Sequence, residues 1–375
     1  MDDSIPTLLF DIGSSAIRAG LLTDKEPRFI IPTAFPEGDN EFPIDREIPA
    51  SSKVSFVVHN GEVSNKDRFN FIVASIFSSI FPDDQDDSES LRVIMTNQPL
   101  SSNNYLSFMT ETAFELLSAE SLLMKPPALF TLSSFSSPTG MCVDVGHNNT
   151  HIITVQDGYV VSNSVTRSFA AGSALDLFTQ RFQFGYNTID TWEQYQKATN
   201  LKHKYAHSTL SLENDLAEEE DDLVIYGATC GEMLFNPPMF EAAFPENEED
   251  YFHDPFSETI STLMEMDPIH VLIANAIEKC DTTNRGAIWN NIILTGGTSM
   301  MPGFADRLRA GLKKRAPPTI TPKLKIPEDP ILSAYHGMIA CCQFYADAEP
   351  WVQADDYNAD PRKVISMFKS YGITK

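Results

Sequence analysis

Two Asp-x-Gly turns carry the residue types in this chain that are best suited to chemistry. The first turn, Asp11–Ser15, brings together a carboxylate, a glycine and two hydroxyl side chains. The second turn, Asp144–Asn148, again begins with aspartate and has glycine two residues later. A glycine lets the backbone approach a ligand closely, and the N–H groups of such a turn suit an anion such as phosphate. Each turn is therefore a candidate phosphate-binding loop.

The segments around both turns predict the same local structure. Leu8–Leu22 places one apolar run before its turn and another after it, and Met141–Val155 repeats this order. Apolar runs separated by a glycine turn are typical of a strand, a tight turn and a return strand. Two matching hairpins far apart in one chain predict a duplicated domain that holds one ligand from both sides.

A third glycine site follows a predicted strand at Trp289–Leu294. This strand runs into Thr295–Thr298, which contains paired glycines, and then into a predicted helix through Ala305, Leu308 and Leu312. A strand that ends in glycines just before a helix N-terminus is another place where a flat or anionic ligand can approach the backbone.

The rest of the chain alternates strands with amphipathic helices. Apolar spacing predicts helices over Asn65–Phe81, Leu106–Leu117, Gly172–Phe184 and Glu193–His207. Strands are predicted over Pro27–Pro32, Val54–His59 and Leu91–Thr96. Asp267 is predicted to cap a further helix that has Pro268 at its first position. Three acidic runs are predicted to be solvated loops, namely Asp83–Glu89, Glu218–Asp222 and Glu246–Asp250.

Composition limits the kind of protein that this is. A chain of 375 residues with 42% hydrophobic and 21% charged residues is long enough for two lobes and is typical of a globular protein. Its formal net charge of −25 opposes direct binding to nucleic acid and to anionic membranes. The five scattered cysteines support neither a disulfide framework nor a zinc site. No apolar run approaches the ~20 residues that span a bilayer, so we expect a soluble intracellular protein.

One basic cluster stands out against this acidic background. It comprises Arg307, Arg309, Lys313, Lys314, Arg315, Lys323 and Lys325. We interpret it as a solvated helix face and loop, with a contact patch for an acidic partner as the alternative.

The two hairpins and the third glycine site, in this order, resemble the actin and hexokinase superfamily of two-lobed ATP-binding proteins. The likeness is greatest to the actin-related proteins, because Gly296–Arg307 is actin-like almost residue by residue and Arg18 stands where actins place lysine. It extends over nearly the whole chain, which is identified as a divergent actin-related protein. The resemblance implies an α/β fold of two similar lobes, each with a mixed five-stranded sheet flanked by helices. This is the actin-like arrangement of a duplicated ribonuclease-H-like fold, with a nucleotide cleft between the lobes.

The resemblance also divides the chain into lobes. The first lobe would contain residues 1–126 and 327–375, with a reduced small subdomain around 30–65. The second lobe would contain residues 127–326, with a small subdomain around 173–260.

ATP or ADP with Mg²⁺ would bind in the cleft of such a protein. The resemblance implies phosphate contacts from Gly13, Ser14, Ser15 and Arg18 in the first lobe and from Gly146, His147, Asn148 and Asn149 in the second. Asp11 and Asp144 would orient a hydrated Mg²⁺ ion, which keeps several waters and usually needs only one or two carboxylates. Lys202 would lie beside the nucleoside with the loop formed by Gly296, Gly297 and Thr298.

The sequence departs from the family pattern at residues that would take part in nucleotide binding and hydrolysis. Pro127 occupies the position where actins carry the glutamine that positions the attacking water, and proline has no polar side-chain group for this task. We therefore expect ATP hydrolysis to be very slow or absent, so that the protein is not an enzyme and holds nucleotide as a wedge between its lobes. His203 stands where the family's ribose-binding glutamate is expected, and His147 replaces a loop aspartate. We interpret both histidines as drift in a site without catalysis.

Filament formation is also unexpected for this sequence. Phe35–Val57 corresponds to the loop that polymerising actins insert into the next subunit, and here it is shorter and rich in prolines and carboxylates. The final segment, Asp355–Lys375, departs from the aromatic and cysteine ending that is typical of actins. The first hypothesis is therefore a non-polymerising or filament-capping subunit of a dynactin-like cytoskeletal assembly or of a chromatin-remodelling assembly.

The partners of such a subunit would be other proteins, including actin or actin-related proteins, without direct contact to nucleic acid or membrane. The expected compartment is the cytoplasm, with the nucleus as the alternative. Two other functions stay open: a small-molecule kinase of the same superfamily and a divergent polymerising actin. A chaperone ATPase fits less well, because the chain leaves no room for a separate substrate-binding domain after the third glycine site.

Overall fold

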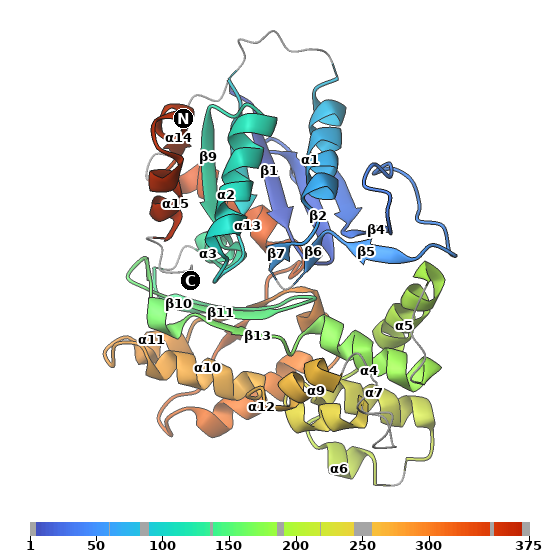
Figure 1. The fold of residues 1–375 in the computed structure, drawn as a ribbon. Helices are drawn as coiled ribbons and strands as arrows, with labels where there is room; N and C mark the ends of the chain where they lie inside the picture. Colours follow the sequence, from blue (N-terminus) through green and yellow to red (C-terminus); the bar gives the residue numbers. More distant parts are fainter. Residues whose placement is uncertain are drawn as a thin grey trace.

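Two mixed β-sheets, one in each of two lobes, form the framework of the molecule (Figure 1). The computed structural model describes residues 5–59, 61–82, 90–135, 138–185, 191–217, 219–243, 257–345 and 349–369. The predicted two-lobed α/β fold is confirmed. Among the described residues each sheet has six strands, one more than the sequence predicts.

The first sheet has the order β16-β9-β8-β1-β2-β3. β1 pairs antiparallel with β2 and parallel with β8, which makes the sheet mixed. The strands are β1 (Thr7–Ile12), β2 (Ala16–Leu21), β3 (Phe29–Pro32), β8 (Arg92–Thr96), β9 (Ser121–Lys125) and β16 (Val352–Gln353). The sequence analysis predicted neither β9 nor the two-residue β16, which returns from the C-terminal part of the chain to pair with β9.

The second sheet repeats the centre of the first. β10 pairs antiparallel with β11 and parallel with β14, as β1 does with β2 and β8. The strands are β10 (Gly140–Val145), β11 (Thr150–Gln156), β12 (Tyr159–Val160), β13 (Thr166–Ser168), β14 (Ile292–Thr295) and β15 (Leu324–Lys325). Both β12 and β13 pair with β11, so this sheet branches at its edge. Both predicted Asp-x-Gly hairpins are thus confirmed as strand, turn and return strand.

Two short hairpins extend the first lobe. β4 (Ala34–Pro36) pairs with β5 (Val54–Phe56), and β6 (Val58–His59) pairs with β7 (Glu62–Val63). Residues 37–53 form the long connection between β4 and β5.

Helices cover the outer faces of both sheets. In the first lobe these are α1 (Lys66–Ile80), α2 (Asn103–Glu111) with a π-helical turn (Thr112–Leu116), α14 (Ala354–Ala359) and α15 (Pro361–Lys369). The second lobe has α4 (Gly172–Phe184), α5 (Trp192–Tyr205), α6 (Leu212–Asp215), α7 (Asp222–Glu232), α9 (Ser257–Met264), α10 (Ile269–Glu278), α11 (Arg285–Trp289) and α12 (Phe304–Arg315). Short 3₁₀ turns lie at Ser162–Ser164, Pro237–Ala243 and Gly297–Met300.

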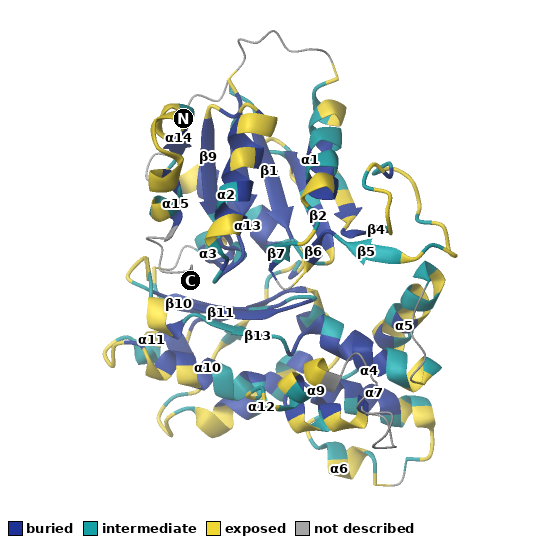
Figure 2. Ribbon diagram, viewed as in Figure 1, coloured by how far each residue is buried: buried dark blue, intermediate teal, exposed yellow. Residues whose placement is uncertain are grey.

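The two lobes share one layer of helices, α3 (Pro127–Ser134) and α13 (Ser333–Tyr345). Phe130 of α3 packs with Leu9 of the first sheet. Leu132, two residues later on α3, packs with Cys142 of the second sheet. The central strands, such as β1 and β14, are buried on both faces (Figure 2), because the helices described above cover one face of each sheet and this shared layer covers the other. The shared layer therefore connects the two halves of the fold, because α3 packs against both sheets.

Some local predictions need correction. The N-cap of α10 is Pro268, not Asp267, and no side chain bonds to the first turn of that helix. The acidic run before α7 is not only a loop, because Asp221 caps that helix by accepting a hydrogen bond from the Leu223 N–H. Asp83–Glu89 and Glu246–Asp250 lie outside the described residues. None of the helices in the described ranges is long and apolar enough to cross a membrane.

Candidate functional site

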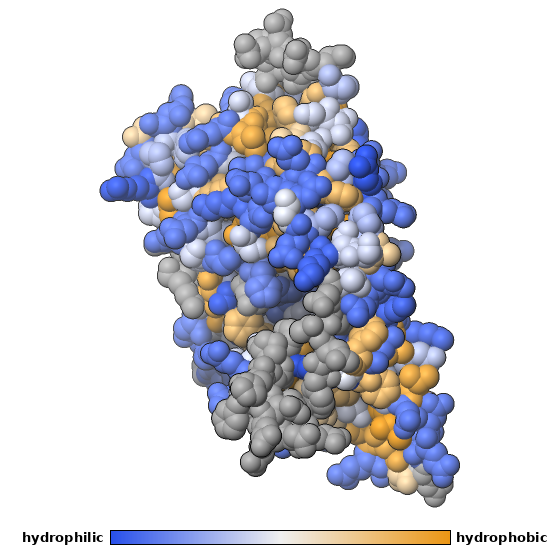
Figure 3. All heavy atoms as spheres, turned by 45° about the vertical axis from the view of Figure 1, so that its right-hand side comes forward, coloured by the Kyte–Doolittle hydropathy of each residue, from blue (hydrophilic) through white to orange (hydrophobic). Residues whose placement is uncertain are grey.

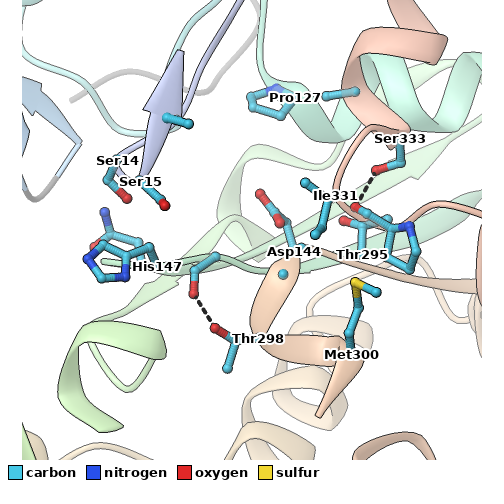
Figure 4. Close-up of a pocket in the computed structure, with 18 of the residues that line it drawn as sticks. Ser14, Ser15, Pro127, Asp144, His147, Thr295, Thr298, Met300, Ile331 and Ser333 are labelled. Carbon is cyan, nitrogen blue, oxygen red and sulfur yellow. Dashed lines mark hydrogen bonds between the residues drawn. The ribbon is translucent and has the colours of Figure 1, made fainter. Parts of the chain in front are cut away.

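A cavity of about 450 Å³ lies where the two Asp-x-Gly hairpins face each other. Its walls come from the β1–β2 turn, the β10–β11 turn, the glycine loop after β14, and the first residues of α3 and α13. Figure 4 shows Ser14, Ser15 and His147 at one end of the cavity and Met300 and Ile331 at the other. One end is thus polar and the other apolar.

The β1–β2 turn is held rigidly by its neighbours. The Gly13 N–H donates to the Ala16 carbonyl at 3.1 Å and closes the turn on itself. Thr33, the residue after β3, stabilises the β1–β2 turn, because the Thr33 hydroxyl donates to the Ser14 carbonyl at 2.6 Å. The N–H of Gly13 is therefore engaged within the turn, and Ser14 and Ser15 present the groups that face the cavity.

The β10–β11 turn repeats this geometry in the second lobe. The Gly146 N–H donates to the Asn149 carbonyl at 3.0 Å, and the Gly146 carbonyl accepts from the Thr298 hydroxyl at 2.8 Å. Gly296 makes this approach of the third glycine loop possible. Its φ is +89°, and a Cβ there would lie 2.5 Å from Asp144 Oδ1. Glycine is required at this position, because a side chain would collide with the carboxylate that lines the cavity.

Asn148 differs from the other predicted residues, because it does not line the cavity. Its backbone N–H donates to Ser14 Oγ at 3.1 Å. Its side-chain Nδ2 lies 3.3 Å from Nδ1 of His59. Both partners belong to the first lobe, so Asn148 links the two turns directly.

Asp11 and Asp144 form an acidic pair in the middle of the cavity. Asp11 is buried and lies 3.3 Å from the Arg18 guanidinium, and it accepts a hydrogen bond from the Thr96 hydroxyl. Burial raises the pKa of Asp11, and Arg18 opposes this shift. Burial also raises the pKa of Asp144 to about 6, and the nearby Asp11 carboxylate contributes in the same direction. Two carboxylates that are costly to ionise together favour a bound cation between them.

The second-lobe wall contains a buried ion pair that the sequence analysis missed. Asp176 of α4 is 3% exposed and lies 2.6 Å from Nζ of Lys202 on α5. The other carboxylate oxygen of Asp176 lies 3.6 Å from Nδ1 of His147. The signal in the sequence was a single acid between Leu175 and Leu177 in the apolar stripe of a predicted helix. Such a buried carboxylate needs a cationic partner.

The apolar end of the cavity is lined by Met300, Met301, Pro302 and Ile331. Pro127 is the first residue of α3, and Figure 4 shows it across the cavity from Asp144. Its ring presents carbon atoms only. An apolar slot beside a polar end is the usual construction of a site for a small molecule that has a flat part and a charged part.

Several buried polar atoms in this cavity have no hydrogen-bond partner in the described part of the chain. They are Arg18 Nε, Asn149 Oδ1 and His151 Nε2, which belong to residues in the cavity wall. Buried polar atoms are normally satisfied, so these point to a polar ligand. Among the described residues no group of three or more acidic, histidine or cysteine side chains could hold a metal ion. Two carboxylates are nevertheless enough for a hydrated Mg²⁺ ion that also binds phosphate oxygens. The residues present therefore fit a nucleotide with Mg²⁺.

All predicted site residues except Asn148 line this one cavity, although they come from four separate parts of the sequence. His151 and Gln98 also line it and were not predicted. His151 lies directly opposite Asp144 in the β10–β11 register, so the hairpin register was the signal that could have found it.

Comparison with known families agrees with this geometry. The model of the actin family matches residues 2–215 and 223–366, which is most of the chain. Proteins with the actin fold generally bind ATP or ADP with a divalent metal ion, generally interact with other proteins, and include ATPases. The match covers both hairpins, the shared helix layer and the third glycine loop, and on this evidence the chain belongs to the actin family.

Proposed function

We propose that this chain is a divergent actin-related protein that holds a nucleotide with Mg²⁺ between its lobes and hydrolyses it very slowly or not at all. It acts as a non-polymerising or filament-capping subunit of a larger assembly. The observation that carries the proposal is Pro127, which lines the cavity opposite Asp144 where the family places its water-positioning glutamine.

Pro127 affects hydrolysis without removing the binding groups. Attack on a terminal phosphate needs a water molecule oriented by a hydrogen-bonding side chain. A pyrrolidine ring offers neither a donor nor an acceptor to that water. The phosphate-facing hydroxyls, Arg18 and the acidic pair are independent of Pro127, so nucleotide binding survives where hydrolysis does not.

The connection between β4 and β5 supports the non-polymerising part of the proposal. Its Ser52 and Ala50 carbonyls accept hydrogen bonds from the N–H groups of Trp192 and Glu193 at 2.8 and 2.9 Å. These N–H groups belong to the first turn of α5, where a helix has no internal partners for them. The ring of Phe56 on β5 also packs against Tyr195 at a centroid distance of 5.5 Å. The segment that would insert into a neighbouring subunit is instead docked on α5 of its own chain.

The remaining parts of the proposal concern organisation and partners. The first lobe comprises residues 1–126 and 327–375 and the second lobe residues 127–326, with small subdomains around 30–65 and 173–260. The partners are other protein subunits, including actin or actin-related proteins, in a cytoskeletal assembly of the cytoplasm. The alternative location is a chromatin-remodelling assembly in the nucleus, which the protein would join through protein contacts because its charge of −25 opposes nucleic acid.

The binding and hydrolysis parts are tested together on nucleotide-stripped protein. Addition of millimolar Mg-ATP should raise the melting temperature, because a ligand that binds only the folded state adds RT ln(1 + [L]/Kd) to stability. A single-turnover assay with γ-labelled ATP should then show bound nucleotide that stays intact. A melting temperature that does not change, or rapid release of labelled phosphate, would overturn the proposal.

The partner assignment needs a separate experiment. The tagged full-length chain is purified from its own cells, and the co-purifying proteins are identified by mass spectrometry. The proposal expects a defined complex that contains other actin-family subunits. Recovery of the chain alone, or as long homopolymers, would contradict it.

A further inference from the structure

Both cations that line the cavity are already paired with carboxylates of the protein. Arg18 lies 3.3 Å from Asp11, and Lys202 lies 2.6 Å from Asp176 and donates to the Gly172 carbonyl at 3.2 Å. With Asp144 included, three carboxylates face two cations, which gives a formal charge of −1 when the histidines are neutral. Without the charge of a Mg²⁺ ion, a polyphosphate would therefore meet no surplus positive charge from the side chains of either wall.

Three histidines line the cavity and could supply that charge, and their surroundings differ. His151 is buried, and burial together with Arg167 lowers its pKa to about 3, so it is neutral. His203 lies beside Lys202, and burial and this ammonium group both lower its pKa. Asp176 raises the pKa of His203 in opposition to these two effects. Of the three cavity histidines, His147 is the one with a close carboxylate contact in the described structure, because Asp176 Oδ2 lies 3.6 Å from its Nδ1. An adjacent carboxylate favours the imidazolium form.

His147 also lies at the polar end of the cavity. It follows Gly146 in the second turn, and its carbonyl accepts a hydrogen bond from the Ser173 N–H at 2.6 Å, which fixes the backbone. Figure 4 shows its ring at the same end of the cavity as Ser14 and Ser15. The next residue, Asn148, contacts Ser14 Oγ directly.

We propose that His147 contacts the anionic part of the ligand as an imidazolium, taking up a proton from solvent as the ligand binds, with Asp176 as the positioning residue behind the ring. This inference rests on the proposed function and adds its regulation: the affinity of the site for nucleotide is coupled to pH. Lys202 holds Asp176 in place and is not itself a phosphate contact.

The charged groups around His147 agree with this coupling. Burial has the largest effect and lowers the pKa of His147 in the free protein. Asp176 opposes this shift, whereas Lys202, His59 of the first lobe and His203 lower the pKa further. The free site is therefore mostly neutral at His147. An anion in the cavity would raise the pKa of His147, so affinity is highest at low pH and falls as pH rises through the pKa of the complex.

Isothermal titration calorimetry with Mg-ADP tests the proposal on nucleotide-stripped, full-length protein. Titrations at about pH 7.5 in buffers of different ionisation enthalpy measure the protons taken up, and at this pH both Asp144 and the phosphates are ionised. We expect net uptake of up to one proton. Between about pH 6.5 and 8.5, Kd should rise by as much as about tenfold per pH unit.

Two substitutions separate His147 from other groups. The His147→Asn variant should bind Mg-ADP without proton uptake, and its Kd should lack the part of the pH dependence that His147 causes in the parent. His147→Lys carries a permanent charge and should bind at high pH as tightly as the parent binds at low pH. His336→Asn is the matched control, because His336 lies on the surface beside Glu26, and it should behave like the parent.

The outcomes distinguish the two proposals. Unchanged proton uptake in His147→Asn, or binding by the parent without uptake, overturns the role of His147 and leaves the nucleotide site intact. Failure of the parent to bind Mg-ADP or Mg-ATP at all overturns both.

Discussion

At the scale of single residues, the Asp144 carboxylate is costly to ionise in the folded chain. Its pKa is raised from 3.8 to about 6 by burial and by the neighbouring Asp11. The folded chain therefore holds a proton that the unfolded chain has released between these two values. The free energy of unfolding attributable to Asp144 is highest below about pH 4 and falls as pH rises to about 6.

The substitution Asp144→Asn tests whether the contribution of Asp144 to stability falls as pH rises. An amide cannot ionise, so in metal-free and nucleotide-free protein the variant should gain about 2 kcal/mol over the parent at neutral pH and little at about pH 4. Urea denaturation of both proteins across this range measures the difference, which removes the contribution of the other acidic residues. A difference that is constant with pH would contradict the prediction.

Pro127 is the residue on which the proposed loss of hydrolysis rests. Pro127→Gln introduces an amide at the first position of α3, facing the cavity. We expect hydrolysis of bound Mg-ATP to rise at least tenfold, since a positioned polar group contributes about 10²–10⁴ to such reactions. Phosphate release in single-turnover conditions is the measurement.

Pro127→Ala is the matched control for this gain. It removes the same ring and supplies no polar group, so its hydrolysis should equal that of the parent. Equal rates in Pro127→Gln and Pro127→Ala would mean that something other than the missing amide limits hydrolysis.

The candidate site was predictable from sequence only where its geometry follows from a local motif. The glycine turns in the sequence were enough to predict that Ser14 and His147 belong to the site, because a turn fixes the position of its own residues. Asp176 left a local signal, as an acid within the apolar stripe of its helix, but its pairing with Lys202 joins two helices and no local pattern specifies it. Asn148 was predicted to contact phosphate, but its N–H and side chain are used to contact the other lobe, which only the assembled fold determines.

At the scale of elements, α13 and α3 pack closely against each other in the layer that the lobes share. Gly337 of α13 packs directly on the backbone of α3, and a Cβ there would lie 2.2 Å from the Phe130 carbonyl oxygen. Neither backbone can move without disturbing a sheet, because Phe130 and Leu132 are buried against opposite sheets. This glycine therefore allows the close spacing of α13 and α3.

Gly337→Ala is expected to lower the free energy of unfolding by about 2 kcal/mol, the usual size of an overpacking effect. Urea denaturation followed by circular dichroism measures this loss. Gly286→Ala in α11 is the control, because a Cβ there meets nothing within 4 Å and alanine favours a helix. It should leave stability unchanged or raise it slightly, and an equal loss in both variants would contradict the argument.

Helices were predicted well where apolar residues recur along one face of the helix. The predicted helix over Gly172–Phe184 agrees with the bounds of α4, because its apolar stripe is continuous. The two-residue strands β15 and β16 were missed, since so short a segment has no periodicity and is defined by the strand it pairs with. The five-residue β9 was missed as well. Asp267 resembled a cap, but Pro268 takes that place in the folded chain.

At the scale of the whole molecule, the net charge of −25 makes copies of the chain repel one another. The chain carries 52 acidic and 27 basic residues. Figure 3 shows that hydrophilic residues dominate the described part of the upper lobe on that face, with hydrophobic residues gathered toward the lower part of the other lobe. Repulsion between copies extends about 10 Å at 0.1 M salt and only about 3 Å at 1 M salt.

The salt dependence separates repulsion from the docked connection between β4 and β5. If repulsion alone prevented assembly, screening at about 1 M salt would allow filaments to form. The hydrogen bonds from Trp192 and Glu193 and the packing of Phe56 on Tyr195 are short-range and persist in salt. We therefore expect the chain with Mg-ATP to stay in the supernatant after ultracentrifugation at low and at high salt. Pelleting at high salt only would show that charge, and not the docked segment, keeps the chain monomeric, and pelleting at both would contradict the non-polymerising function.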